Sequence, residues 1–459
     1  MSIASTLAAY AAELEFDQIP HDVVDQLKLH LIDGLGCALG AVDAKPVVAA
    51  RAAAYELSKP DSCTLIGGEF RASVEMATFA NSVAVRYLDY CDVYLGKEVT
   101  PPAATAISAF AMGEATSASG KACLTSLAVI YESLLRLCAA TSLRRRGWDT
   151  VSFGAIASAL GAARAFSLDK RQTEQALAIA TVASTGLLRA RLGELSMWKA
   201  AASANAARYG VFAAVLAKHG MTGPDSIFEG EFGLLQSVTG PFELPEQTWR
   251  SRDVMIKRYP AQVFTQTAIE AAISLSVRVD KRDIKTVDVA TFKRAADAAG
   301  DPHYWTPTTR ETADHSLPYV ISAALNDGNL TPLQFDSAHL NDPVLFALMR
   351  KVSVHEDPEL SRQFPMAMPA RLRIECYSGQ VEQAEVAIPF GHPARPMDTA
   401  AVDAKFMALA APAVGDQAAH DLLDRLGRLE SLDDLSPIAE ILGAGAVARN
   451  TRHEYNVAK

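Results

Sequence analysis

Leucines recur every fourth residue over 23–41, at Leu27, Leu31, Leu35 and Leu39. This spacing places apolar side chains along one face of an α-helix, whereas a strand presents its two faces alternately. Three glycines occur in the same segment. Because a glycine inside a helix costs about 1 kcal/mol, we expect this helix to lie in close contact with others.

Helical spacing continues through the alanine-rich first half of the chain. It predicts further helices over 72–94, 101–118, 121–140, 151–166, 173–185 and 200–219. Asp169 and Gln172 have the spacing of a capping box ahead of one of these helices. A large all-helical domain is therefore expected at 1–243.

A different pattern begins after Pro245. Val287 and Val289 alternate with other residues and indicate a strand. Two further alternating segments flank a turn at 378–380 and predict a β-hairpin. Helical spacing returns at 265–277, 316–326, 399–412 and 417–443. We expect a mainly α protein with a second, smaller α+β domain at 244–396 and C-terminal helices at 397–459 that pack back on the helical domain.

The amino-acid composition argues against several classes of function. The 459 residues are 49% hydrophobic and 21% charged, which is typical of a chain with a folded core. The net charge of −10 argues against a nucleic-acid or anionic-membrane partner, because both require a basic face. The chain lacks an apolar run of about 18 residues that could span a bilayer, and its first 20 residues do not have the pattern of a signal peptide. We expect a cytoplasmic protein.

The cysteines do not have the spacing of a metal site. None of the six forms a C-x-x-C pair, and no zinc-type histidine pattern accompanies them. They are predicted to be buried, reduced thiols. No metal is expected.

Seven segments, in order along the chain, resemble the MmgE/PrpD family. They are 27–41, 77–92, 147–180, 197–224, 256–272, 313–328 and 388–406. The resemblance implies a large helical domain built from both ends of the chain and an α+β lid. It also implies a homodimer that uses neither metal nor nicotinamide, so no cofactor is expected.

The resemblance further implies an activity on small di- or tricarboxylates. In this family a base removes or returns a proton next to a carboxylate, and water or carbon dioxide leaves. Such chemistry requires cations that neutralise the substrate carboxylates and a base positioned at the reacting carbon.

Two candidate catalytic residues come from the helical domain. Asp89, in the sequence Leu88-Asp89-Tyr90-Cys91-Asp92, matches the family's active-site carboxylate. Asp92 lies three residues further and is predicted to share its helical face. The alternative for this cluster is a solvated helix end. Lys199 matches a lysine that faces the substrate in the family, and the alternative for it is a surface charge.

His315 and Tyr319 are the candidates from the lid. Their spacing of four predicts one helical face, although Pro318 limits the helix to its first turn there. The family has a site tyrosine near this position. Histidine titrates near neutral pH and suits acid–base work, but a lone histidine is as often structural.

Several basic and apolar residues are candidates for substrate binding. A carboxylate could be bound by Lys257, Arg258, Arg189 or Arg191. The segment Arg144–Arg146 is predicted instead to be a solvated loop. Tyr94 and Thr100 are also assigned to the binding site. Val93 and Trp148 are apolar residues that could line it.

The sequence departs from the family at three histidines. The aligned places hold Thr100, Asp149 and Gln266. Acid–base work would then fall to other groups, such as Asp149, Lys199 or His315. The leading hypothesis is a lyase or isomerase acting on a small polycarboxylate. A non-catalytic binding protein and an enzyme for a less charged acid remain the alternatives.

Overall fold

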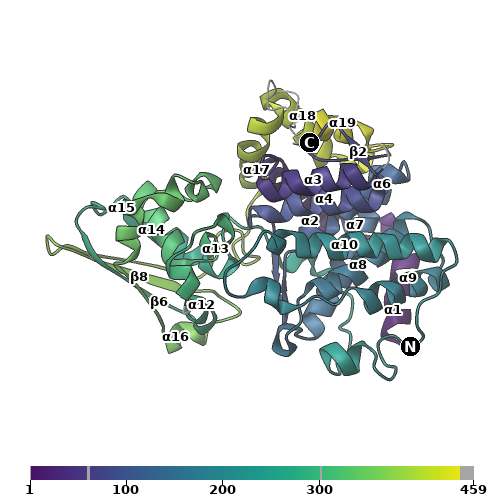
Figure 1. The fold of residues 1–459 in the computed structure, drawn as a ribbon, viewed down its shortest axis with the longest axis horizontal. Helices are drawn as coiled ribbons and strands as arrows, with labels where there is room; N and C mark the ends of the chain where they lie inside the picture. The colour runs from purple at the N-terminus through teal and green to yellow at the C-terminus, as the bar shows by residue number, and fades with distance from the viewer. Residues whose placement is uncertain (1, 59–61, 300–301, 445–459) are drawn as a thin grey trace, which may run out of the picture.

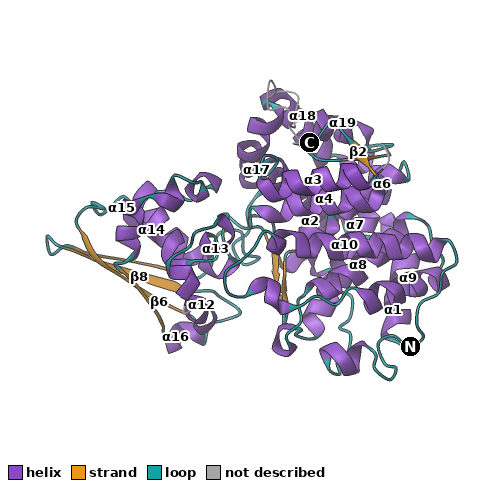
Figure 2. Cartoon of the chain, viewed as in Figure 1, coloured by secondary structure: helices purple, strands orange, loops and turns teal. Residues whose placement is uncertain are grey.

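The computed structural model describes residues 2–58, 62–299 and 302–444 (Figure 1). One apolar core is formed by residues between 7 and 256 together with residues 397–442. A second core lies between residues 259 and 376. We call residues 2–256 and 397–444 the body and residues 257–396 the lid. The mainly α fold with a smaller α+β part is confirmed (Figure 2).

The body is helical and carries only short strands. Its helices are α1 (Ile3–Glu13), α2 (His21–Leu39), α3 (Lys45–Leu57), α4 (Val74–Tyr87), α5 (Ala103–Ala106), α6 (Ser108–Ala115), α7 (Gly120–Ala140), α8 (Val151–Ala165), α9 (Lys170–Ala183), α10 (Trp198–Lys218), α17 (Thr399–Val414), α18 (Asp416–Gly427) and α19 (Ser436–Ala444). Its strands are β1 (Cys63–Thr64), β2 (Arg71–Ala72), β3 (Val93–Leu95), β4 (Val99–Thr100) and β5 (Val254–Met255).

Glycines bring helices of the body close together. A Cβ at Gly36 of α2 would lie 3.1 Å from the Phe406 ring of α17, and one at Gly40 would lie 2.8 Å from Leu409. The close contact predicted for this helix is therefore confirmed. Its partner is α17, so a helix from the N-terminal part of the chain and one from the C-terminal part pack side by side (Figure 1).

The capping box predicted at Asp169 is present. The Asp169 carboxylate accepts from the Gln172 backbone N–H at 2.8 Å, and the Gln172 side chain accepts from the Asp169 N–H at 3.2 Å.

The cysteines are buried and free, as expected. Helix α7 is long and apolar enough to cross a membrane, but 89% of its most apolar window is buried inside the protein.

The lid contains a four-stranded sheet with helices packed against it. Its strands are β6 (Ile284–Thr291), β7 (Val352–Glu356), β8 (Ala370–Cys376) and β9 (Val381–Val386), in the order β7-β6-β8-β9. Its helices are α11 (Gln266–Ser276), α12 (Lys293–Ala299), α13 (Arg310–Ala313), α14 (Leu317–Asp327), α15 (Pro343–Met349) and α16 (Pro358–Ser361). The predicted hairpin is β8–β9, and its turn contains Gly379 at φ +88°.

Three predicted helices are shorter than expected. The helix over 72–94 ends at Tyr87, because Asp89 adopts a left-handed backbone with φ +50°. The helix over 101–118 is divided between α5 and α6. The helix over 417–443 is interrupted after Gly427, and the Asp434 carboxylate then accepts from the N–H of Ser436, where α19 begins. The first of these differences determines the geometry of the site.

Candidate active site

A cavity of about 430 Å³ is lined by both the body and the lid. About half of its charged lining residues were candidates from the sequence. The body contributes Arg86, Asp89, Glu98, Arg144, Asp149 and Arg191, and the lid contributes Lys257, Arg294, Asp297 and His315. Apolar walls include Val93, Val99, Val263 and Phe264. A mixed polar and apolar lining of this size suits a small charged ligand.

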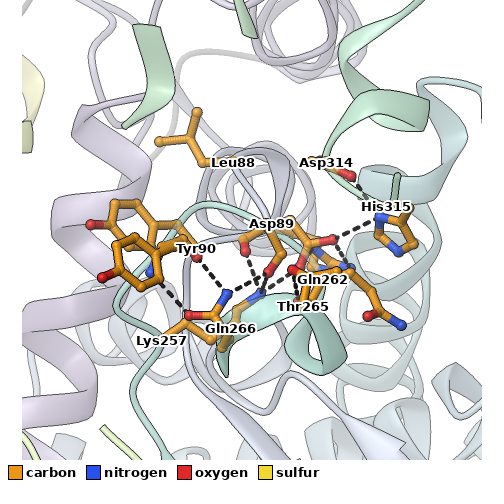
Figure 3. Close-up of polar contacts among 12 residues, drawn as sticks. Leu88, Asp89, Tyr90, Lys257, Gln262, Thr265, Gln266, Asp314 and His315 are labelled. Atoms are coloured by element: carbon orange, nitrogen blue, oxygen red, sulfur yellow. Dashed lines mark hydrogen bonds and ion pairs between the residues drawn. The ribbon is translucent and has the colours of Figure 1, made fainter. Parts of the chain in front are cut away.

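Asp89 lies at the centre of a buried cluster of cations. The helix α4 ends just before it, and aspartate is one of the few non-glycine residues that tolerate a left-handed backbone. Its carboxylate lies 2.5 Å from Lys257 Nζ (Figure 3). It lies 3.2 Å from Lys199 Nζ. Arg86, one turn earlier on α4, approaches to 3.2 Å. Burial alone would raise the pKa of Asp89, but Arg86, Lys257 and Lys199 outweigh it and hold this pKa well below its ordinary value.

Lys199 joins the body to the lid. It lies in the first turn of α10, and its Nζ is 2.6 Å and 2.9 Å from the two carboxylate oxygens of Asp314. The same Nζ donates to the backbone carbonyl of Glu311 at 3.3 Å. Lys199 therefore neutralises one carboxylate from each part of the molecule.

His315 faces the cavity from the lid. Its Nδ1 lies 2.5 Å from Asp314 Oδ1, 3.2 Å from Lys199 Nζ and 3.5 Å from Asp89 Oδ2. Its Nε2 makes no hydrogen bond to any of the residues that the structure describes. Burial lowers the pKa of His315 and Lys199 lowers it further, while Asp314 opposes both. The imidazole is therefore a neutral base at pH 7.

The carboxylates and His315 also resemble a metal-ligand set. Ligand atoms of Asp89, Asp314 and His315 lie within 4.8 Å of one another. However, the ammonium groups of Lys199 and Lys257 already occupy these carboxylates. A divalent cation would have to displace a buried ammonium group, so these residues do not fit a resident metal.

Asp149 reaches the cavity but is held by Arg191. The Arg191 Nε lies 2.7 Å from Asp149 Oδ2, and its Nη1 donates to the backbone carbonyl of Lys199 at 2.6 Å. Both residues line the cavity. Arg191 thus links Asp149 to the start of α10, and Asp149 is a partner in an ion pair.

The structure does not bring Tyr319 to the cavity. Helix α14 begins at Leu317 with Ser316 as its N-cap, so His315 precedes the helix and shares no face with Tyr319. The Tyr319 ring is fully buried in the lid core, and its hydroxyl donates to the Gln334 carbonyl at 2.6 Å. Tyr319 therefore stabilises the lid, and we do not retain it as a catalytic candidate.

Three of the other binding candidates also lie away from the cavity lining. Tyr94 and Thr100 face each other in the β3–β4 pair, and their neighbours Val93 and Val99 line the cavity instead. This follows from the alternation of side chains along a strand. The Arg258 guanidinium packs over the Phe390 ring at 5.9 Å.

Asp92 likewise points away from Asp89. It accepts from the Tyr131 hydroxyl at 2.6 Å and from the Ala103 N–H at 2.9 Å. His30 Nδ1 lies 3.1 Å from the same carboxylate. The shared helical face predicted for Asp89 and Asp92 is wrong, because the helix has ended before both.

Comparison with known proteins identifies the family. The MmgE/PrpD N-terminal domain matches residues 5–247, and the MmgE/PrpD C-terminal domain matches residues 259–426. The chain belongs to the MmgE/PrpD family.

Named relatives of this family cover nearly the whole chain at low identity. A cis-aconitate decarboxylase of Aspergillus terreus is 24% identical, with 96% of each chain covered. The cis-aconitate decarboxylase of Homo sapiens is 25% identical, over 96% of this chain and 94% of the relative. A 2-methylcitrate dehydratase of Escherichia coli (strain K12) is 26% identical, over 84% and 88% respectively.

At the position of the third histidine of the MmgE/PrpD pattern, this chain has Gln266, and its side chain has a structural role. Gln266 is fully buried, and its side chain hydrogen-bonds to both the N–H and the carbonyl of Tyr259. Its Nε2 also donates to the Ala261 carbonyl at 3.2 Å (Figure 3). Gln266 thereby fixes the loop that follows Lys257.

Sequence reasoning missed several charged residues at and beside the cavity. Asp314 could have been found as the neighbour of His315, and Arg86 as the residue one helical turn before Asp89. Arg144 was interpreted as part of a solvated run, and it is exposed but lines the cavity. Arg294 has no local signal, because the packing of α12 against the rest of the lid determines its position.

Proposed function

We propose that this protein is a lyase that transfers a proton at a carbon next to a carboxylate of a small tricarboxylate. The observation that carries the proposal is the Asp314–His315 pair at a cavity lined by lysine and arginine. The relatives named above are a decarboxylase of cis-aconitate and a dehydratase of 2-methylcitrate. Both reactions include such a proton transfer, and this family kinship supports the assignment of the substrate class.

His315 is the base in this proposal. Since Asp314 accepts a hydrogen bond from Nδ1, we assign the ring proton to Nδ1, which leaves the Nε2 lone pair for the substrate. The lowered pKa keeps His315 unprotonated at neutral pH. A positioned base of this kind contributes about 10²–10⁴-fold to the rate.

The cations beside His315 stabilise the charge that develops. Removing a proton next to a carboxylate puts negative charge on the adjacent carbon and carboxylate. Arg86 and Lys257 line the cavity. Together with Lys199 they carry one positive charge more than the negative charges of Asp89 and Asp314. Fixed cations in a partly buried site stabilise such an anion more than water does.

Three family histidines are replaced in this chain, by Thr100, Asp149 and Gln266. Their absence favours one rival, a protein that binds the acid without converting it. The test incubates the protein with citrate, 2-methylcitrate and cis-aconitate in D₂O and follows deuterium incorporation and product formation by NMR. We expect turnover of at least one acid and a fall of about 10²–10⁴-fold in kcat for His315→Asn.

The matched control is His355→Asn, an exposed histidine on β7. Asparagine at 315 can still donate to Asp314, so the melting temperatures of both variants should match that of the wild type. Binding of the acids without exchange or turnover in the wild type would favour the non-catalytic rival. Equal loss of activity in both variants would remove His315 from the proposed site.

A further inference from the structure

Two arginines line the cavity from opposite parts of the molecule. Arg144 belongs to the body and lies in the short 3₁₀ turn Arg144–Arg146. Arg294 belongs to the lid and lies near the start of α12. Neither residue is part of the Asp89 cluster. The same cavity therefore has a second cationic region.

Neither guanidinium pairs with a carboxylate in the part of the chain that the structure describes. This distinguishes them from Arg86 and Arg191, which are both ion-paired. Arg294 instead packs its guanidinium over the Phe264 ring at 4.7 Å. A pair of arginines without acidic partners at a cavity wall is a site with unused hydrogen-bond donors.

The nearest acids are engaged elsewhere. Glu98 accepts from the Ser142 hydroxyl at 2.9 Å and from the backbone N–H of Arg144 at 3.1 Å. Asp297 pairs with Lys293 at 3.0 Å. Burial lowers the pKa of Arg294, and the nearby charge of Arg144 lowers it further, which Glu98 only partly offsets. An anion bound beside both arginines would offset this repulsion between their positive charges.

We propose that Arg144 and Arg294 form a second carboxylate subsite, which binds the carboxylate of a tricarboxylate substrate that is remote from His315. The proposal rests on the proposed function, since the Asp89 cluster binds the carboxylate at the reacting carbon. Guanidinium groups bind carboxylates through paired, charge-assisted hydrogen bonds. An acid with one carboxylate would leave this pair uncompensated, so the subsite selects for polycarboxylates.

The subsite also couples binding to the position of the lid. One carboxylate that contacts both arginines would connect the body to α12 of the lid. The two arginines then act on the same group, so their contributions to affinity are coupled rather than independent. This coupling separates a shared subsite from general attraction by surface charge.

The test measures the Kd of propane-1,2,3-tricarboxylate, which has neither a hydroxyl nor a double bond to lose, for the full-length protein. We expect Arg144→Gln and Arg294→Gln each to weaken binding by about tenfold or more. The double variant should lose less than the product of the two effects. Arg294→Lys should bind with intermediate affinity, because it keeps the charge and loses the planar fork.

The matched control is Arg145→Gln, the next residue of the same exposed turn, which does not line the cavity. An equal loss in this control, or an unchanged Kd in both Arg144→Gln and Arg294→Gln, would overturn the subsite. If Arg144→Gln and Arg294→Gln turned over substrate with unchanged Kd and KM, the subsite would be rejected and the proposed lyase function would stand. Arginine-dependent binding without turnover would support the subsite and reject the lyase.

Discussion

At the scale of the residue, the site depends on one aspartate in an unusual backbone conformation. With φ at +50°, Asp89 turns the chain immediately after α4 and places its carboxylate between Lys199 and Lys257. Lys257 also donates to the backbone carbonyl of Asp89. Strained conformations of this kind persist where surrounding contacts hold them, and they are common at functional sites.

The lowered pKa of His315 predicts the pH dependence of catalysis. The imidazole must be unprotonated to accept a proton, so activity is lost as the pH falls through the pKa of His315. Burial and then Lys199 place this pKa below the ordinary 6.5. We therefore expect kcat/KM to fall on the acidic side with a midpoint below pH 6.5.

A pH–rate profile of the wild type measures this prediction. His355→Asn should give the same profile, whereas the residual activity of His315→Asn should lack this acidic limb. An inflection above pH 6.5 that disappears in His315→Asn would contradict the environment that the structure gives to this histidine.

At the scale of the element, the C-terminal helix α17 supports the site from behind. Lys405 of α17 donates to the backbone carbonyls of Tyr90 and Lys257 at 2.8 Å and 2.9 Å. Its Nζ also lies 2.5 Å from Asp33 of α2, a fully buried carboxylate. Burial raises the pKa of Asp33, and Lys405 offsets only part of this effect. Lys405 thus holds the backbone on both sides of the Asp89–Lys257 pair.

We expect Lys405→Met to lower the free energy of unfolding by about 3–5 kcal/mol, because it leaves Asp33 buried without a partner. Urea unfolding measures this change. The double variant Lys405→Met/Asp33→Leu should recover part of the stability but not the activity, since the two carbonyls still lack their donor. Lys293→Met is the control at an exposed lysine. If Lys405→Met were as stable as this control, the buried pair would not support the site.

The elements were predictable where local periodicity determines them. The leucine spacing of α2 marks a helix that is buried on all sides after Leu29, and the alternation in β8 and β9 reflects burial of one face of the sheet. In both cases the sequence contains the pattern directly. The end of α4 was not predictable in this way, because a left-handed aspartate has no periodic signal. The start of α14 did have one: Ser316 as N-cap followed by Pro318 predicts a helix that excludes His315.

The candidate site was likewise predictable from the sequence only in part. Asp89 and Lys199 were found through family resemblance and His315 through its suitability for acid–base work, and the three meet in space. Tyr319, assigned by the same route, does not reach them. Arg144 and Arg294 are far apart in the sequence and line the same cavity only through the contact of lid and body. No pattern within either segment could have predicted that pairing.

At the scale of the whole molecule, the short helix α13 and the residues after it connect the lid to the body. Arg310 donates to the Leu88 carbonyl at 3.3 Å, directly before Asp89, and Thr312 accepts from the Leu195 N–H at 3.4 Å. Lys199 binds Asp314 at the end of the same segment. Figure 1 shows α13 between the lid and the body. The catalytic histidine of the proposal is therefore held at the contact between the two parts of the protein.

This arrangement predicts that Asp314 controls both the chemistry and the contact between lid and body. In Asp314→Asn, Lys199 keeps Asp89 but loses its charged partner from the lid. The His315 ring keeps only a neutral amide oxygen in place of a carboxylate as its acceptor. We expect backbone amides of 310–316 to exchange hydrogen for deuterium faster than in the wild type, because local opening no longer breaks a buried ion pair. Asp327→Asn, on the outer end of α14, should leave exchange in 310–316 unchanged.

Adding propane-1,2,3-tricarboxylate extends the same experiment. A ligand at 100 times its Kd stabilises the bound state by about 2.7 kcal/mol, and this ligand contacts lid and body together. Exchange in 310–316 should therefore slow in the wild type, and much less in Asp314→Asn, where the contact is already weakened. Identical exchange in the wild type and Asp314→Asn, with and without ligand, would mean that other contacts hold the lid and that the Lys199–Asp314 pair serves His315 alone.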